Sequence, residues 1–217
     1  MSIRQAYSDW AATYDVDRNL TRDLDRAVTK NVLAGLRFKS ILELGCGTGK
    51  NTSLLAEIGE KVHALDFAES MIERAKDKLR LNNVRFEVAD ITASWPCANQ
   101  SCDLVVSNLV LEHVRELSFV FAEASRVLIA EGRFFLSELH PARQYQGKQA
   151  IFEMNGTPTP VEAFVHHLTD FTETANQHGF SLESLKEWWH EADRHKAPRL
   201  VSFVFKKTAS SELGRAF

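Results

Sequence analysis

The sequence is poor in cysteine and has no long apolar run, and each shortage excludes a class of protein. Its three cysteines, Cys46, Cys97 and Cys102, are an odd number without the spacing of metal ligands, so neither a disulfide framework nor a metal site is expected. No apolar stretch has membrane-spanning length, and residues 1–20 alternate charged with aromatic side chains instead of forming a signal-peptide core. We therefore expect a cytoplasmic protein without a membrane segment.

A clustered basic surface is missing as well. Lysine and arginine total 26 against 29 acidic residues, which gives a net charge of −3, and the basic residues form no run. Because phosphate binding requires clustered lysines and arginines, a nucleic-acid partner is not expected. With 217 residues and 44% apolar content, the chain is long enough to bury one sizeable core as a single domain.

The sequence does contain a glycine-rich turn that follows an apolar strand and precedes a helix-like segment, in residues 41–49 (ILELGCGTG). Gly45, Gly47 and Gly49 let a ligand lie against bare backbone, and the free N–H groups at the start of the next helix suit an anionic group. A dinucleotide fingerprint has its third glycine one residue later, where this chain has Lys50. A nicotinamide oxidoreductase is therefore the weaker interpretation.

Two acids follow at the ends of the next expected strands. Asp66 can accept both hydroxyls of a ribose, and Asp90 can accept the exocyclic amine of adenine. Phe67 and Met71 bracket the start of the helix after Asp66 and can pack on the purine. Each of these features also has a purely structural interpretation when it is taken singly. The turn can be a tight connection, Asp66 can be a helix N-cap, and Asp90 can be a turn residue. Their order on successive strand ends favours a nucleoside site.

The same motifs resemble those of a known family. ELGCGTG at 43–49, LDFAESM at 65–71, VAD at 88–90, DLVVSNLVLEH at 103–113 and RVLIAEGRFFL at 126–136 are similar, in order and spacing, to the class I S-adenosylmethionine-dependent methyltransferases. The resemblance covers residues 38–140 and is greatest for the small-molecule branch that contains the ubiquinone/menaquinone and malonyl-carrier-protein methyltransferases. One departure is the stretch 129–132, where the family usually has a structural proline-glycine turn.

The resemblance implies S-adenosylmethionine (SAM) as cofactor, S-adenosylhomocysteine (SAH) as product, and direct displacement of the methyl group by the oxygen or nitrogen of a small-molecule acceptor. It also implies the following cofactor contacts: Tyr14, Arg22, Glu43, Gly45, Cys46, Gly47, Gly49, Asp66, Phe67, Met71, Asp90, Ile91, Asn108 and Leu109. A nucleoside-binding regulator without turnover is the alternative from another functional class. The motifs specify the methyl donor better than the acceptor or the oligomeric state.

The order of apolar segments predicts an α/β fold. Strands are expected near 40–45, 61–66, 84–89, 103–108 and 132–138, with helices near 51–58 and 70–81 between them, and such alternation implies parallel pairing. A helix near 165–178 and strands near 182–188 and 199–206 follow. By resemblance, the last two strands close a Rossmann-like, doubly wound sheet of seven strands as an antiparallel pair. We expect one domain, 1–217, with an N-terminal helical lid at 1–37 and a substrate-side insertion at 139–167.

Two segments are expected to select the acceptor, because ligands of such sheets lie outside the carboxyl ends of the strands. In the first, Tyr7, Trp10 and Tyr14 form either a lid or an aromatic staple, and Tyr14 with Arg18 or Arg22 can hold the methionine carboxylate. The second is the long insertion, where His140 is the candidate general base, although a structural histidine is the simpler interpretation. The substrate-contact candidates are Tyr7, His113, Arg143 and His166.

Overall fold

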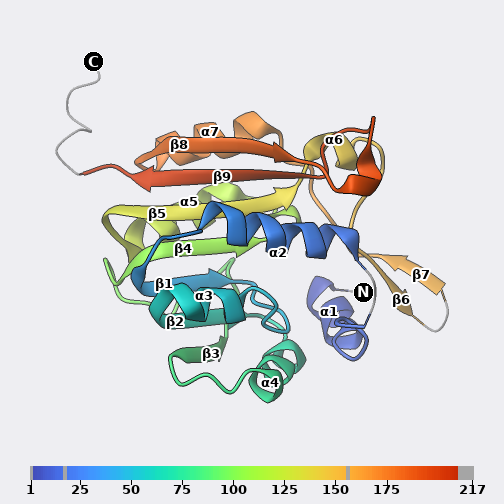
Figure 1. Cartoon of the computed structure of the whole chain (residues 1–217), viewed down its shortest axis with the longest axis horizontal. Coiled ribbons are helices and arrows are strands. Elements are labelled where there is room, and N and C mark those ends of the chain that lie inside the picture. Colours follow the sequence, from blue (N-terminus) through green and yellow to red (C-terminus); the bar gives the residue numbers. More distant parts are fainter. Residues whose placement is uncertain (1, 17–18, 155–156, 210–217) are drawn as a thin grey trace.

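A seven-stranded sheet forms the centre of the protein in a computed structural model that describes residues 2–16, 19–154 and 157–209 (Figure 1). Its strand order is β3-β2-β1-β4-β5-β9-β8. The strands are β1 (Phe38–Leu44), β2 (Gly59–Asp66), β3 (Val84–Val88), β4 (Cys102–Asn108), β5 (Leu128–Leu139), β8 (Phe180–Trp188) and β9 (Leu200–Lys207). Strands β1 to β5 pair in parallel, whereas β9 is antiparallel to both β5 and β8. This confirms the predicted doubly wound sheet and its antiparallel closing pair.

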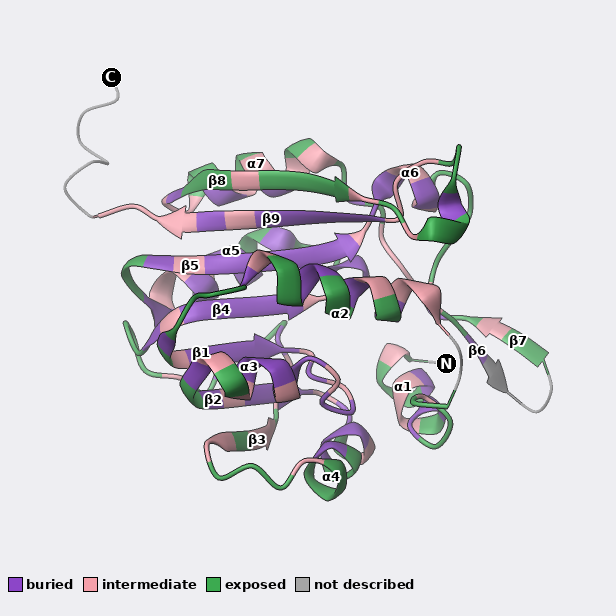
Figure 2. Ribbon diagram, in the orientation of Figure 1, coloured by how far each residue is buried: buried purple, intermediate pink, exposed green. Residues whose placement is uncertain are grey.

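Helices cover both faces of the sheet. Leu104 and Val106 of β4 pack toward α2 (Leu20–Val32) and α3 (Thr52–Ile58), whereas Val105 between them packs toward α5 (Leu117–Val127) and α7 (Leu168–Gln177). The central strands are therefore buried on both sides, as a parallel sheet requires (Figure 2). A further helix, α4 (Glu69–Lys78), connects β2 to β3. Within the described residues, no helix is both long and apolar enough to span a membrane.

The strand order reverses between β1 and β4, and this determines where a ligand can bind. From β1 the chain crosses over to β2 and then to β3, each one strand further out. It then returns to the other side of β1 as β4. At such a switch point the connections leave in opposite directions and open a crevice at the carboxyl ends of the strands. The glycine turn after β1 and residues 108–114 after β4 both lie at this edge.

The segment between β5 and α7, where the substrate-side insertion was expected, contains regular structure. It begins with the short helix α6 (Pro141–Gln144) and then forms a separate hairpin of β6 (Ile151–Met154) and β7 (Thr157–Pro160). Helix α1 (Ile3–Trp10) lies beside this hairpin (Figure 1), and Ala6 and Trp10 share a small apolar cluster with Phe152 and Val161. We call α1 and the hairpin together the cap.

Candidate functional site

The glycine turn is fixed to the end of β2 by backbone and carboxylate hydrogen bonds. Cys46 N–H donates to the carbonyl of Leu65 at 2.9 Å, and Gly47 N–H donates to Asp66 Oδ2 at 2.8 Å. All three glycines of the motif have positive φ, and a Cβ on Gly45 would lie 2.3 Å from Val110 Cγ2. At Gly47 a Cβ would meet nothing within 4 Å. The turn therefore packs tightly on one side and presents open backbone on the other.

Asp66 is held rigidly beside this turn. Its second oxygen, Oδ1, accepts a hydrogen bond from Ala68 N–H at 2.9 Å, so the carboxylate bridges the glycine turn and the start of the helix after β2. Burial raises the pKa of Asp66 to about 6, against the opposing effect of these backbone hydrogen bonds. A buried carboxylate with remaining lone pairs suits a ligand that brings hydroxyl donors.

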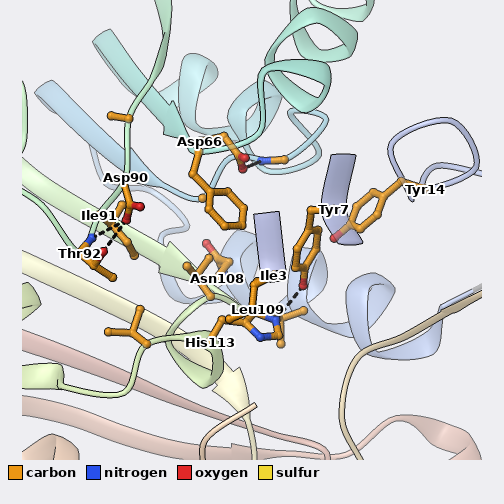
Figure 3. Close-up of a pocket in the computed structure, with 16 residues that line it drawn as sticks. Ile3, Tyr7, Tyr14, Asp66, Asp90, Ile91, Thr92, Asn108, Leu109 and His113 are labelled. Carbon is orange, nitrogen blue, oxygen red and sulfur yellow. Dashed lines mark hydrogen bonds between the residues drawn. The ribbon is translucent and has the colours of Figure 1, made fainter. Parts of the chain in front are cut away.

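A cavity of about 250 Å³ opens in front of Asp66, and we call it the nucleoside cavity (Figure 3). The predicted cofactor residues that line it are Tyr14, Gly45, Gly47, Asp66, Phe67, Asp90, Ile91, Asn108 and Leu109. Thr92, which the sequence did not single out, also lines it and donates to Asp90 Oδ1 through its amide at 2.9 Å. Residues from the carboxyl ends of four strands, β1, β2, β3 and β4, thus meet around one space.

Other predicted cofactor residues lie outside that cavity. Arg22, Glu43 and Cys46 line a smaller cavity of about 50 Å³ beneath the turn, which we call the polar cavity. Met71 and Gly49 line neither cavity: Met71 is buried against Ala68, and a Cβ on Gly49 would lie 2.6 Å from Leu79 Cδ1. Both pack behind the residues that line the cavities, and their contact with the cofactor stays a prediction. Arg18 lies outside the described residues.

A third cavity, of about 390 Å³, lies between the cap and the start of β9. Its charged lining is mostly basic and comprises Arg22, Arg143, Lys148, Lys196 and Arg199, with the acids Glu112 and Asp193. We call it the basic cavity. Tyr7, Tyr14 and Leu109 line both this cavity and the nucleoside cavity. Leu109 has a φ of 56°, in the left-handed region that side chains other than glycine rarely adopt.

The predicted substrate residues divide between the cavities and the surrounding structure. Arg143 lines the basic cavity, and His113 lines the nucleoside cavity, where its Nε2 lies 2.8 Å from the Tyr7 hydroxyl. Because His113 Nδ1 donates to the carbonyl of Glu162 at 2.7 Å and burial lowers the pKa of the ring, the Tyr7 hydroxyl is the donor in this pair. Figure 3 shows the Tyr7–His113 pair at the cavity wall.

The structure does not bring His140 or His166 to either of these cavities. His140 caps α6 by accepting from Ala142 N–H at 3.1 Å, and its Nε2 donates to Glu187 at 2.9 Å. His166 donates to the carbonyl of Val114 at 2.8 Å. The ring nitrogens of both histidines are thus bonded to other parts of the protein, which for His140 favours the structural interpretation given above.

Several lining residues have no motif that would reveal them. Asp193 and Arg199 come from the chain beyond α7, and Asp25 comes from the middle of α2. Glu112 had a weak signal, because it stands next to His113 in the segment after β4. Only the fold brings these distant segments together.

The comparisons with known proteins agree with this geometry. Residues 42–136 match the model of a family described as a methyltransferase domain. The chain is also 32% identical over 158 residues to the malonyl-[acyl-carrier protein] O-methyltransferase of Hahella chejuensis, a match that covers 71% of this chain and 55% of that protein. The chain thus spans about half the length of this relative.

Two solved structures share the architecture. The DhpI–SAH complex superposes with a TM-score of 0.73 at 21% identity, covering 94% of this chain and 95% of that one. The [4+2]-cyclase SpnF has a TM-score of 0.66 at 15% identity, covering 85% and 80%. Since a cyclase has the same fold, the fold alone does not determine the reaction. The domain match, the relatives and the motifs at the strand ends together show a methyltransferase domain at residues 42–136 that is similar to those of the class I S-adenosylmethionine-dependent methyltransferases.

Proposed function

We propose that this enzyme transfers the methyl group of SAM to an oxygen or nitrogen atom of a small acceptor that carries an anionic group and binds in the basic cavity. The observation that carries the proposal is the meeting of the nucleoside cavity and the basic cavity at Tyr7, Tyr14 and Leu109. A donor in the nucleoside cavity and an acceptor in the basic cavity would meet at this shared wall. Residues 1–37 and 139–167 would then act as lid and acceptor-side insertion.

The donor fits the nucleoside cavity through its adenosine part. Asp66 would accept the ribose hydroxyls, and Asp90 would accept the adenine amine beside Phe67 and Ile91. The methionine part would extend toward Tyr14 and Arg22, whose guanidinium lies 3.9 Å from the centre of the Tyr14 ring and donates to the Tyr14 carbonyl at 2.6 Å. This stacked arginine would face the methionine carboxylate.

The charge of the basic cavity supports an anionic acceptor. Asp193 is already paired with Arg143 and Arg199 at 2.9 and 2.6 Å, so its charge is neutralised within the protein. Lys148 and Lys196 add further positive charge to the lining. The Hahella relative is named for methylation of a malonyl group on a carrier protein, and a carboxylate acceptor of that kind is already deprotonated and needs no base.

The chemistry is a displacement at the methyl carbon of a sulfonium, so alignment is the main task of the protein and supplies about 7–11 kcal/mol of barrier reduction in comparable reactions. An acceptor with an O–H or N–H group also needs a base. Glu112 lines the basic cavity, and burial raises its pKa to about 7. Glu112 is thus better situated than His140 to take such a proton.

The experiment that tests the proposal is SAH formation with matched small acids. The purified enzyme is incubated with SAM and with malonate thioesters, hydroxy acids or amino acids, and products are identified by mass spectrometry. We expect methylation of at least one acid, and Lys148→Glu with Lys196→Glu should reduce it by raising the acceptor KM. Glu112→Gln and His140→Ala compare the two candidate bases. SAM binding without any SAH formation would instead support the nucleoside-binding regulator.

The affinity for SAH is expected to fall about tenfold between pH 7 and pH 5. A protonated Asp66 loses an acceptor for the ribose hydroxyls, and its pKa of about 6 in the free enzyme puts the transition in this window. Isothermal titration calorimetry across pH 5–8 measures the effect. Asp66→Asn is the matched control and should show weak affinity that is nearly independent of pH; the same pH dependence in that variant would contradict the assignment.

Deleting residues 1–14 is expected to weaken SAH binding by about tenfold, because one or two aromatic contacts with the ligand are lost. The effect on the free energy of unfolding should be smaller. The two large core clusters of the sheet contain no residue of α1 among those described. Tyr7 and Tyr14, in contrast, line the nucleoside cavity. If the truncated protein melts far lower without ligand and binds SAH with unchanged affinity, the segment is a structural staple.

A further inference from the structure

The polar cavity beneath the glycine turn contains two buried hydrogen-bond acceptors without a partner in the described part of the chain. Its lining includes the carboxyl groups of Asp25 and Glu43 and the amides of Asn51 and Asn108. The cavity shares Gly45, Gly47, Tyr14, Asn108 and Leu109 with the nucleoside cavity, so the two adjoin. Asp25 is 3% exposed and Asn51 8% exposed, which makes any unsatisfied polar atom here costly.

Asp25 determines which way the two amides face. Asn108 Nδ2 donates to Asp25 Oδ1 at 2.8 Å, and Asn51 Nδ2 donates to Asp25 Oδ2 at 2.8 Å. Because each amide nitrogen faces the carboxylate, each amide oxygen turns away from it. Among the described residues, neither Asn51 Oδ1 nor Asn108 Oδ1 has a hydrogen-bond partner.

The hydroxyl groups beside the cavity do not satisfy these oxygens. Thr48 donates its hydroxyl to Asp15 at 2.6 Å, and Thr52 donates its hydroxyl to Glu43 at 2.6 Å. A small group with several N–H donors would satisfy both oxygens, and a positive charge on it would complement the carboxylate of Asp25. An ammonium group has three donors and no acceptor, and a space of about 50 Å³ is large enough for it.

We infer that Asp25, with Asn51 and Asn108, binds the α-ammonium group of the cofactor's methionine moiety. The inference rests on the assignment of SAM as the cofactor, and it gives α2 a direct part in the site. The carboxylate on the same carbon would then face Arg22, which also lines the polar cavity. The donor would thus be recognised at both ends, its adenosine at Asp66 and its amino-acid part at α2.

Asp25 is preferred over Glu43 as the anionic partner. Burial raises the pKa of Glu43 to about 8, so this carboxyl is protonated at neutral pH. Burial also raises the pKa of Asp25, but hydrogen-bond donors at Ser137, Asn108 and Asn51 oppose that shift, and a bound ammonium would oppose it further. Glu43→Gln is therefore a matched control, since it replaces a neutral buried group with another of similar shape.

The test compares three ligands by calorimetry: SAH, its des-amino analogue that keeps the carboxylate, and 5′-methylthioadenosine, which has neither group. Wild type should bind SAH about 10- to 100-fold more tightly than the des-amino analogue, as expected for charged hydrogen bonds. Asp25→Asn should bind these two within a factor of about three of each other. Its affinity for methylthioadenosine should match wild type, which shows that the fold and the adenosine site are intact. Glu43→Gln should keep the preference for SAH.

A full preference for SAH in folded Asp25→Asn overturns the inference, as does loss of the preference in Glu43→Gln alone. Should Asp25→Asn not fold, Asn51→Ala keeps the carboxylate and removes one orphaned acceptor; an unchanged preference there overturns the inference as well. Wild type that binds none of the three ligands contradicts the cofactor assignment itself. If wild type instead binds SAH and its des-amino analogue with equal affinity, only the ammonium site is contradicted and the cofactor assignment stands.

Discussion

Asp66→Ala is expected to weaken SAM binding by about 2–3 kcal/mol, or about 30- to 150-fold, the usual effect of losing charged hydrogen bonds. The carboxylate faces the nucleoside cavity and is also the acceptor for the amides of Gly47 and Ala68 at 2.8 and 2.9 Å. Its removal therefore takes away the ribose acceptor and loosens the turn that carries the open backbone. Calorimetry with SAM and SAH at pH 7.5 measures the loss.

Asp103→Ala is the matched control for this prediction. Asp103 also accepts two backbone hydrogen bonds, from Lys39 N–H at 2.8 Å and Ser40 N–H at 2.9 Å, but it lies near the start of β4, at the opposite edge of the sheet from the site. We expect it to reduce stability without changing the affinity for SAM. Undiminished affinity in a folded Asp66→Ala protein would contradict the ribose assignment.

Asp193→Ala is expected to lower the free energy of unfolding by about 3–5 kcal/mol, because it leaves the buried Arg143 and the partly buried Arg199 without their partner. Asp193 is 1% exposed and lies 2.9 Å from Arg143 Nη2 and 2.6 Å from Arg199 Nε. Urea denaturation at pH 7 measures the change. Glu183→Ala is the control, since the exposed pair of Glu183 with Arg133 should contribute under about 1 kcal/mol.

The same ion network gives stability a distinct dependence on pH. Hydrogen bonds from Arg199 and Arg143 lower the pKa of Asp193 to about 2, below its ordinary value. A carboxyl whose pKa is depressed by folding contributes stability that is present above its unfolded pKa and is lost as the pH falls. Wild type should therefore lose stability between about pH 4 and pH 2, and Asp193→Ala should lack this component. Equal losses in both proteins over this window would show that the network contributes little.

The sheet and the nucleoside cavity were predictable because their signals are local. Each strand ends in its own motif, and the carboxyl ends of parallel strands meet at one edge, so Gly45, Asp66 and Asp90 could be assigned to one site from their order alone. Met71 does not line the cavity, and position in a helix does not by itself reveal which face reaches a ligand. It is buried in a cluster with Ala68, against which Phe67 packs, and Phe67 does line the cavity.

The basic cavity was much less predictable, because its walls come from segments that are distant in sequence. Arg143 was expected there, but Asp193 and Arg199 were not, since a lone acid or arginine near the end of a chain has no motif around it. His140 was favoured for its position just after β5. Its ring nitrogens are instead bonded to Ala142 and Glu187, an arrangement that depends on β8 lying beside α6 and not on any local pattern.

The nucleoside cavity and the basic cavity are built mostly by different parts of the chain, and this separation has a consequence for how the enzyme can diverge. Among the described residues, the walls of the nucleoside cavity come mainly from positions 45–114, whereas those of the basic cavity come mainly from 7–22, 139–151 and 193–199. Positions 7–22 include Tyr7 and Tyr14, which line both cavities, but substitutions at 139–151 and 193–199 can change acceptor preference without disturbing the binding of the donor. A lineage of such enzymes can therefore acquire new substrates by altering the segment after β5 and the corner near β9 while it inherits the donor half unchanged.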